Sequence, residues 1–158
     1  LYIERFNAIV HMNPDILVLG SFINDVPSSF PDRLLFRSRL VTYLRMARAA
    51  LPNCTIVVCG SSPLFGQNIA PGGELFNHEL DKQIAFNAWG DSNAIFVPMV
   101  GRAAPDRPIV PNTANGWYYL SGGSAPFNDA SPTTRFYPVL ATIIASAIRN
   151  FFLRLPPV

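Results

Sequence analysis

The sequence predicts an α/β domain in which a parallel sheet is covered by helices on both faces. Three short runs are nearly continuous in apolar residues, and helical patterns separate them. The runs are Asp15–Phe22, Cys54–Gly60 and Ala94–Val100. Central strands of parallel sheets have this composition, and strands that alternate with helices are joined by right-handed crossovers. We expect residues 1–158 to form a single domain.

Helical patterns lie before, between and after these runs. We expect helices at Tyr2–Met12, Pro31–Leu51, Glu74–Trp89 and Thr134–Phe152. Pro138 would then fall near the first turn of the last helix, where its missing N–H does little harm.

Apolar residues at three- and four-residue spacing mark the buried face that we expect of each helix. In the helix at 31–51 they are Leu34, Leu40, Val41, Leu44, Ala47 and Leu51. In the helix at 74–89 they are Phe76, Leu80 and Ile84. In the last helix they are Leu140, Ile143, Ile144, Ala147, Ile148 and Phe151. The arginines on the other faces of the helix at 31–51 are expected to be solvated, and they are Arg33, Arg37, Arg45 and Arg48.

Composition excludes several classes of protein. Hydrophobic residues make up 49% of the chain and charged residues 14%, which is too apolar for a disordered segment. The net charge of +2 gives no electrostatic case for nucleic acid or an anionic membrane as a partner. No apolar run reaches the roughly 18 residues of a membrane-spanning helix, and no secretory signal is visible. We therefore expect a soluble protein, with its compartment unassigned.

The two cysteines, Cys54 and Cys59, lie in one predicted strand. Five residues of strand span about 16 Å, whereas a disulfide needs Cα atoms within about 7 Å of each other. We therefore expect two buried free thiols. The sequence holds no metal-ligand motif, no dinucleotide-binding Gly-x-Gly-x-x-Gly and no phosphate-binding P-loop, so neither a metal nor a cofactor is expected.

Ligands of open α/β sheets bind beyond the carboxyl ends of the strands. Asn24-Asp25 follows the first run, where a side-chain amide can donate to an oxyanion that forms on an ester carbonyl. The alternative is a turn or helix-capping asparagine. A second polar stretch, Asn128–Thr133, precedes the last helix, and its alternative role is an Asx turn and helix N-cap.

Over almost the whole chain, the order and spacing of these features resemble the later part of the SGNH/GDSL family of serine hydrolases. The family's third block, Gly-x-Asn-Asp at a strand end, is matched by Asn24-Asp25, with Phe22 in place of the glycine. Its last block, Asp-x-x-His-Pro-Thr before the final helix, is matched at Pro132 and Thr133.

The other positions of the last block depart from the family. Ser131 stands where the base histidine belongs, Asn128 stands where the aspartate belongs, and Asp129 is one position away. A serine at position 131 cannot act as a base near neutral pH.

The resemblance implies a flavodoxin-like three-layer α/β/α fold and acyl transfer from small esters, such as O-acetyl groups on carbohydrate. It implies that Asn24 donates to the oxyanion. Asp25, Trp117 and Tyr118 are the candidates for substrate binding, and the alternative role of the two aromatic residues is to anchor their own loop.

The resemblance also places the nucleophile, within a Gly-Asp-Ser block, upstream of Leu1, since no such block occurs in this chain. Ser61 and Ser62 follow the second strand, but we expect no base beside them. His11 precedes the first strand, at the end of the sheet opposite to the ligand-binding edge. His78 lies near the start of its helix on the ligand side, where it could approach the cleft as a catalytic residue, but its apolar neighbours Leu75 and Phe76 favour packing or surface exposure.

The chain opens inside a helical pattern, which predicts that upstream sequence is missing; the alternative is a trimmed terminus of an intact domain. In the family's fold the missing first strand pairs with residues 15–22. An apolar strand left at an open edge is an aggregation hazard. We therefore expect upstream residues, another chain or a rearranged segment to cover this edge.

Three functions remain open at this point. The first is an SGNH-type esterase of which this chain is a part. The second is an inactive relative that keeps the fold for binding or assembly, for example within a viral or extracellular particle. The third is an unrelated flavodoxin-like binding domain. A Gly-Asp-Ser strand upstream would favour the first function over the other two.

Overall fold

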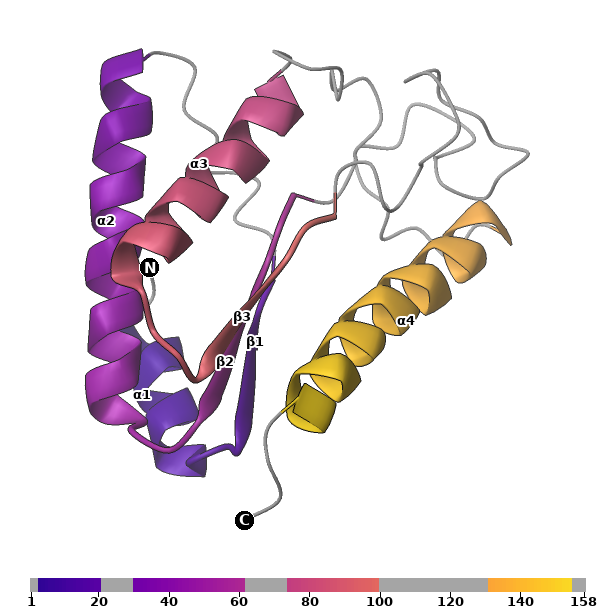
Figure 1. The fold of residues 1–158 in the computed structure, drawn as a ribbon, viewed down its shortest axis with the longest axis horizontal. Helices are drawn as coiled ribbons and strands as arrows, with labels where there is room; N and C mark the ends of the chain where they lie inside the picture. The colour runs from indigo at the N-terminus through magenta and orange to yellow at the C-terminus, as the bar shows by residue number, and fades with distance from the viewer. Residues whose placement is uncertain (1–2, 21–29, 62–73, 100–130, 155–158) are drawn as a thin grey trace.

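The computed structural model describes residues 3–20, 30–61, 74–99 and 131–154, within which lie three strands and four helices (Figure 1). In chain order the elements are α1 (Ile3–Met12), β1 (Ile16–Leu19), α2 (Phe30–Ala50), β2 (Thr55–Cys59), α3 (Glu74–Trp89), β3 (Ala94–Val97) and α4 (Ser131–Arg154). The order of helices and strands is the one predicted, and α3 has the predicted bounds.

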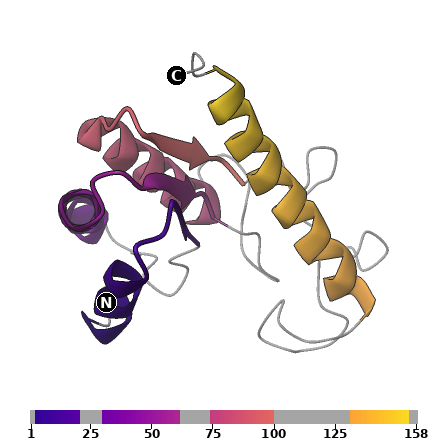
Figure 2. The same cartoon turned by 90° about the horizontal axis from the view of Figure 1, so that it is seen from below.

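The three strands form one parallel sheet in the order β1-β2-β3. Val18 pairs with Val57, and Val58 pairs with Phe96. Helices α1, α2 and α3 lie on one side of the sheet and α4 lies on the other (Figure 1, Figure 2). The predicted α/β class, with a parallel sheet between helices, is therefore confirmed.

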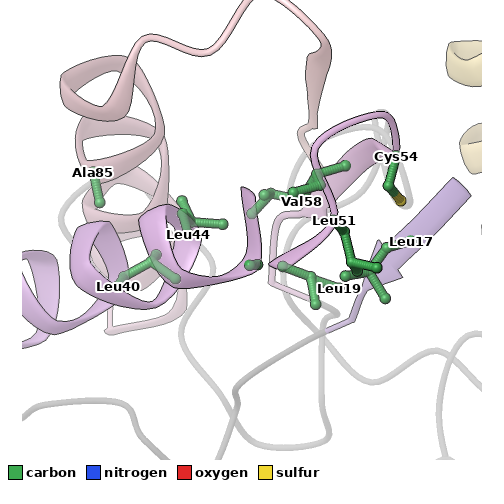
Figure 3. Packing of buried hydrophobic residues seen from close by; sticks show 10 residues of the cluster. Leu17, Leu19, Leu40, Leu44, Leu51, Cys54, Val58 and Ala85 are labelled. Carbon is green, nitrogen blue, oxygen red and sulfur yellow. The ribbon is translucent and has the colours of Figure 1, made fainter. Parts of the chain in front are cut away.

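The larger core lies between the sheet and helices α2 and α3. Alternate residues of a strand point to the same face of the sheet, so every second residue of β1 and β2 enters this core. Its buried members are Leu17, Leu19, Leu40, Leu44, Ala47, Leu51, Cys54, Ile56, Val58 and Ala85 (Figure 3). Helix α1 packs beside α2, where the ring of Phe6 meets the ring of Tyr43 edge-on at 5.9 Å between centroids. Burial raises the pKa of the Tyr43 hydroxyl.

The smaller core lies between the sheet and α4. Its buried members are Val57, Cys59, Val97 and Met99. The α4 residues packed against it are Ile143, Ile144, Ala147 and Ile148, which belong to the predicted apolar stripe. Because both cores meet at β2, all five residues of this strand are buried. Both cysteines are buried and free, as predicted.

β1 is a terminal strand of the described sheet, and only one of its faces is covered. Leu17 and Leu19 are buried, but Ile16 is 38% exposed and Val18 is 43% exposed. The register places Val18 beside Val57, so these exposed side chains point to the α4 side. α4 packs against β3. The expectation that each strand is covered on both faces is therefore wrong for β1 within the described residues.

Three details of the helices also differ from the predictions. On α3, Leu80 and Ile84 are exposed because the buried face of this helix is polar. On α2, Leu34 is exposed although the later residues of its stripe are buried or, for Val41, partly buried. α4 begins at Ser131, so Pro138 lies at its eighth position, beyond the first turn. Among the described helices, none has the length and apolar character needed to cross a membrane.

Arg48 was expected to be solvated, yet its guanidinium joins three elements at the amino end of the sheet. Nε and Nη2 donate to the two carboxylate oxygens of Asp91 at 2.6 and 3.1 Å. Other N–H groups of the guanidinium donate to the carbonyl oxygens of Leu51, Pro52, Cys54 and Asn93. These contacts connect the end of α2 with the segments that lead into β2 and β3.

We expect Arg48→Ala to lower the free energy of unfolding by roughly 2–4 kcal/mol, because several carbonyl groups and the Asp91 carboxylate would lose a charged donor. Urea denaturation followed by circular dichroism measures this difference. Arg45→Ala is the matched control, since Arg45 lies on the same helix and is exposed. Equal stability of the two variants would show that the Arg48 contacts contribute little.

Candidate functional site

Helix α3 turns a polar face toward the sheet and α2. The residues are His78, Glu79, Asp81 and Lys82, and each is at most 9% exposed. Their spacing places them on one side of the helix, followed one turn later by the buried Ala85. Buried charges are costly unless they are paired or hydrogen-bonded, so the partners of these four residues define the site.

The Glu79 carboxylate holds the carboxyl ends of β2 and β3 together. Its Oε2 accepts hydrogen bonds from the backbone N–H of Ser61 at 2.9 Å and from that of Met99 at 2.8 Å. The ammonium group of Lys82 donates to the carbonyl oxygen of Gly60 at 3.1 Å. Side chains of α3 therefore fix the backbone immediately after the central strand.

Gly60 is required by this close approach of α3 to the strand end. A Cβ atom at this position would overlap the Glu79 carboxylate and would lie 2.8 Å from the backbone nitrogen of Met99. Both neighbours are held by the hydrogen bond between them, so neither can move without breaking it. The glycine thus serves a steric need at this strand end.

Ser61 and His78 are in contact at the carboxyl end of β2. The Ser61 hydroxyl oxygen lies 2.9 Å from Nδ1 of His78. Ser61 is 0% exposed and His78 is 1% exposed. The imidazole also packs against Phe36 of α2, with 5.0 Å between ring centroids. Among the described residues, Nε2 of His78 has no hydrogen-bond partner.

Burial is the main reason that the pKa of His78 is lowered to about 4. The Lys82 ammonium lowers this pKa further, and the Asp81 carboxylate opposes the shift. His78 is therefore neutral at neutral pH, with one ring nitrogen able to accept a proton. Burial likewise raises the pKa of Cys59 to about 11, so this thiol is not a thiolate nucleophile.

Asp81 is paired with two arginines of α2. The Arg33 guanidinium donates to both of its carboxylate oxygens, at 2.6 and 3.1 Å, and Arg37 Nε donates to Oδ1 at 2.7 Å. The hydrogen bond to Asp81 raises the pKa of Arg33. Because Asp81 is fully buried, both arginines are held at the α2–α3 interface, contrary to the expectation that they are solvated.

A serine hydroxyl beside a neutral imidazole is the arrangement required for nucleophilic attack with general-base assistance. It occurs here beyond the carboxyl end of a central parallel strand, where ligands of such sheets bind. Among the residues that the structure describes, no group of three or more His, Cys, Asp or Glu side chains is placed to hold a metal ion.

Most of the site residues predicted from the sequence lie outside the described residues. These are Asn24, Asp25, Trp117, Tyr118, Asn128 and Asp129. Ser131 is the first residue of α4, where only the backbone is described. His11 is exposed in the last turn of α1, at the amino end of the sheet, as expected.

The expectation that no base lies beside Ser61 is wrong, because α3 packs with His78 directed at the strand end. His78 is buried, which agrees with the expected packing and not with surface exposure, but its contact with Ser61 was not predicted. One feature of the sequence could have indicated this buried polar face. Polar residues recur at helical spacing and are followed by the small residue Ala85, on the side of the helix opposite to Leu80 and Ile84. Charged residues are usually solvated, so the sequence predicts Leu80 and Ile84 on the buried face.

Comparison of the chain with protein-family models, with curated proteins and with solved structures gave no match. The chemistry of the site therefore has to be inferred from its own geometry.

We expect Gly60→Ala to lower the free energy of unfolding by roughly 2–4 kcal/mol, since the new methyl group would displace Glu79 and leave two buried N–H groups without an acceptor. Urea denaturation measures the change. Gly20→Ala is the matched control, because a Cβ atom after β1 would meet no atom within 4 Å. Similar losses in the two variants would contradict a specific steric requirement at Gly60.

The depressed pKa of His78 predicts a loss of stability in acid. An unfolded histidine has a pKa near 6.5, and folded His78 has a pKa of about 4, so the unfolded state binds more protons between these values. The contribution of His78 to the free energy of unfolding is fully present above its unfolded-state pKa. This contribution falls as the pH decreases toward its folded-state pKa. The expected loss is on the order of 3 kcal/mol.

Urea denaturation at a series of pH values, compared between the wild-type protein and His78→Gln, isolates this contribution. The variant should lack the part of the pH dependence that lies between the two pKa values. His11→Gln, at an exposed position, is the control and should behave like the wild-type protein. Parallel curves for wild type and His78→Gln would show that His78 is not held neutral by the fold.

Proposed function

We propose that the chain is part of a serine ester hydrolase domain of the SGNH type, with a flavodoxin-like fold, that acts on small acyl esters such as O-acetyl groups of carbohydrate. One observation carries this proposal: the parallel pairing of β1 with β2, in which Leu19 lies beside Val58. The chain that leaves β1 toward Asn24 therefore starts at the same edge of the sheet as Ser61 and His78.

The short sequence distance between β1 and Asn24 is compatible with a role for Asn24 at this edge. Asn24 follows Gly20 by four residues, and four extended residues reach at most about 14 Å. This length of chain allows the Asn24 amide to reach the carboxyl edge, where we propose that it donates to an oxyanion on the substrate carbonyl. The polar residues after β2 and on α3 lie at this edge, as expected for a site in a parallel sheet.

The resemblance to the SGNH family supplies the reaction class. In acyl transfer a serine hydroxyl attacks the ester carbonyl, a base accepts its proton, and N–H donors stabilise the oxyanion. Asp25, Trp117 and Tyr118 are the proposed substrate contacts, the two aromatic residues by stacking on a sugar ring.

The proposal predicts that full-length protein hydrolyses an activated acetyl ester such as p-nitrophenyl acetate. Asn24→Ala should lower the hydrolysis rate by roughly 10²–10³-fold, which is the usual cost of removing one oxyanion donor. Release of p-nitrophenolate, followed by absorbance, measures the rate.

Asn150→Ala, on the exposed surface of α4, is the control and should leave the rate unchanged. An active protein with an unchanged rate in Asn24→Ala would remove this residue from the site. A folded full-length protein without any hydrolysis would reject the proposed reaction.

A second candidate function, binding or assembly without catalysis, is favoured by the outer edge of β1. No described strand pairs with this edge, and the adjacent Ile16 and Val18 are partly exposed on the α4 side. Such a strand can accept a further strand from another segment or chain. Absence of hydrolysis in the test above, together with self-association that Val18→Lys abolishes, would favour this function over the esterase.

A further inference from the structure

We infer that Ser61 and His78 are the nucleophile and the general base of the acyl transfer, and that the chain therefore carries its own reactive pair. This inference rests on the proposed ester hydrolysis. It differs from the family resemblance, which places the nucleophile in a Gly-Asp-Ser block that this chain lacks. The contact between the two side chains, at 2.9 Å, is the observation that carries it.

The free nitrogen of His78 supports a role beyond packing. For Nδ1 to accept the Ser61 proton, the ring must carry its own proton on Nε2. That N–H is then buried and has no partner among the described residues, and a buried unsatisfied donor costs about 1–3 kcal/mol. An ester oxygen, a leaving alcohol or a water molecule at this position would satisfy it. The site is thus suited to a polar ligand beside the serine.

The peptide group that precedes Ser61 is fixed at both its N–H and its carbonyl. The Ser61 N–H is bound to Glu79, and the carbonyl of the preceding Gly60 is bound to Lys82. The His78 ring is held by helix α3 and by its packing against Phe36. Preorganisation of a nucleophile and its base in this way removes the entropic cost of bringing them together.

The reaction balances with these two residues. In the first step the Ser61 O–H bond breaks, its proton moves to Nδ1 of His78, and Oγ bonds to the acyl carbon. The ester C–O bond then breaks, and the leaving alcohol takes the proton from Nδ1. In the second step water gives a proton to Nδ1 and adds to the acyl carbon. The bond to Oγ breaks, Oγ regains the proton, and the carboxylic acid leaves.

The surroundings of His78 give this pair an unusual pH dependence. Charged or titratable groups of the neighbouring elements are Glu79, Asp81 and Lys82 on α3, Arg33 and Arg37 on α2, and Cys59 on β2. Burial and Lys82 outweigh Asp81, so the pKa of His78 is lowered to about 4. The base is therefore deprotonated, and the pair competent, far below the pH at which an ordinary histidine becomes protonated.

The decisive experiment locates the covalent intermediate in full-length protein treated with p-nitrophenyl acetate. Acid quenching, proteolysis and mass spectrometry should find an acetyl group on the peptide that contains Ser61. Hydrolysis should fall by roughly 10²–10⁴-fold in Ser61→Ala and in His78→Gln. Ser146→Ala, at an exposed position of α4, is the control and should retain the wild-type rate.

The pH profile of kcat/KM separates a base from a merely structural residue. The acidic limb should have its midpoint at about pH 4 in the wild-type protein, and the residual activity of His78→Gln should lack this limb. Acetylation of the wild-type protein does not depend on whether a variant folds, so it decides the question by itself.

Hydrolysis with the acetyl group on a serine other than Ser61, and full activity in Ser61→Ala, would overturn this inference and leave the proposed esterase intact. A folded wild-type protein that neither hydrolyses the ester nor becomes acetylated would overturn both. Acetylation of Ser61 together with a midpoint near that of a solvent-exposed histidine would retain the nucleophile and reject His78 as its base.

Discussion

The Glu79 carboxylate is the constraint on which the carboxyl edge of this sheet depends. The described pairing of β2 with β3 ends at Cys59 and Val97, after which Gly60 N–H still donates to the Val97 carbonyl oxygen at 2.8 Å. Beyond this point the strands separate, and their next N–H groups would be buried without acceptors. One carboxylate oxygen accepts both of them, and hydrogen bonds to a charged acceptor are among the stronger ones in proteins.

This arrangement links the site to the packing of the helices. Glu79 can reach the strand ends because Gly60 has no side chain, and α3 can approach because its buried charges find partners. The two acids on its inner face are accompanied by three basic residues, which are Lys82, Arg33 and Arg37. Pairing across α2 and α3 fixes the rotation of α3 about its own axis. That rotation places His78 on the same face, next to Ser61, and leaves Leu80 and Ile84 in solvent.

The sequence predicted the α/β character with a parallel sheet, the order of elements and the bounds of α3, because periodicity and apolar runs are local signals. It did not predict which face of α3 is buried. The apolar residues Leu80 and Ile84 predict the buried face because charged residues normally remain in water, and only pairing with α2 reverses that preference. Such pairing joins Asp81 to residues more than 40 positions away, so no local pattern reveals it.

The candidate site was missed for the same reason. Ser61 and His78 are separated by 17 positions, and their contact depends on the rotation of α3. Asn24 followed instead from a motif, which a resemblance can identify without any knowledge of packing. Asn24 lies outside the described residues and stays a prediction from a motif, whereas the contact between Ser61 and His78 is produced by long-range charge pairing that no motif contains.

The orientation of His78 decides what kind of base it can be. In a serine–histidine–aspartate site one ring nitrogen faces the serine and a carboxylate holds the other, which strengthens the base as charge develops. Here packing against Phe36 and attachment to α3 orient the ring, while Asp81 is engaged by arginines. Because burial dominates its pKa, His78 is a weak base that remains neutral in acid. A reaction run by this pair would therefore be slower than that of a full triad, but it would tolerate a lower pH.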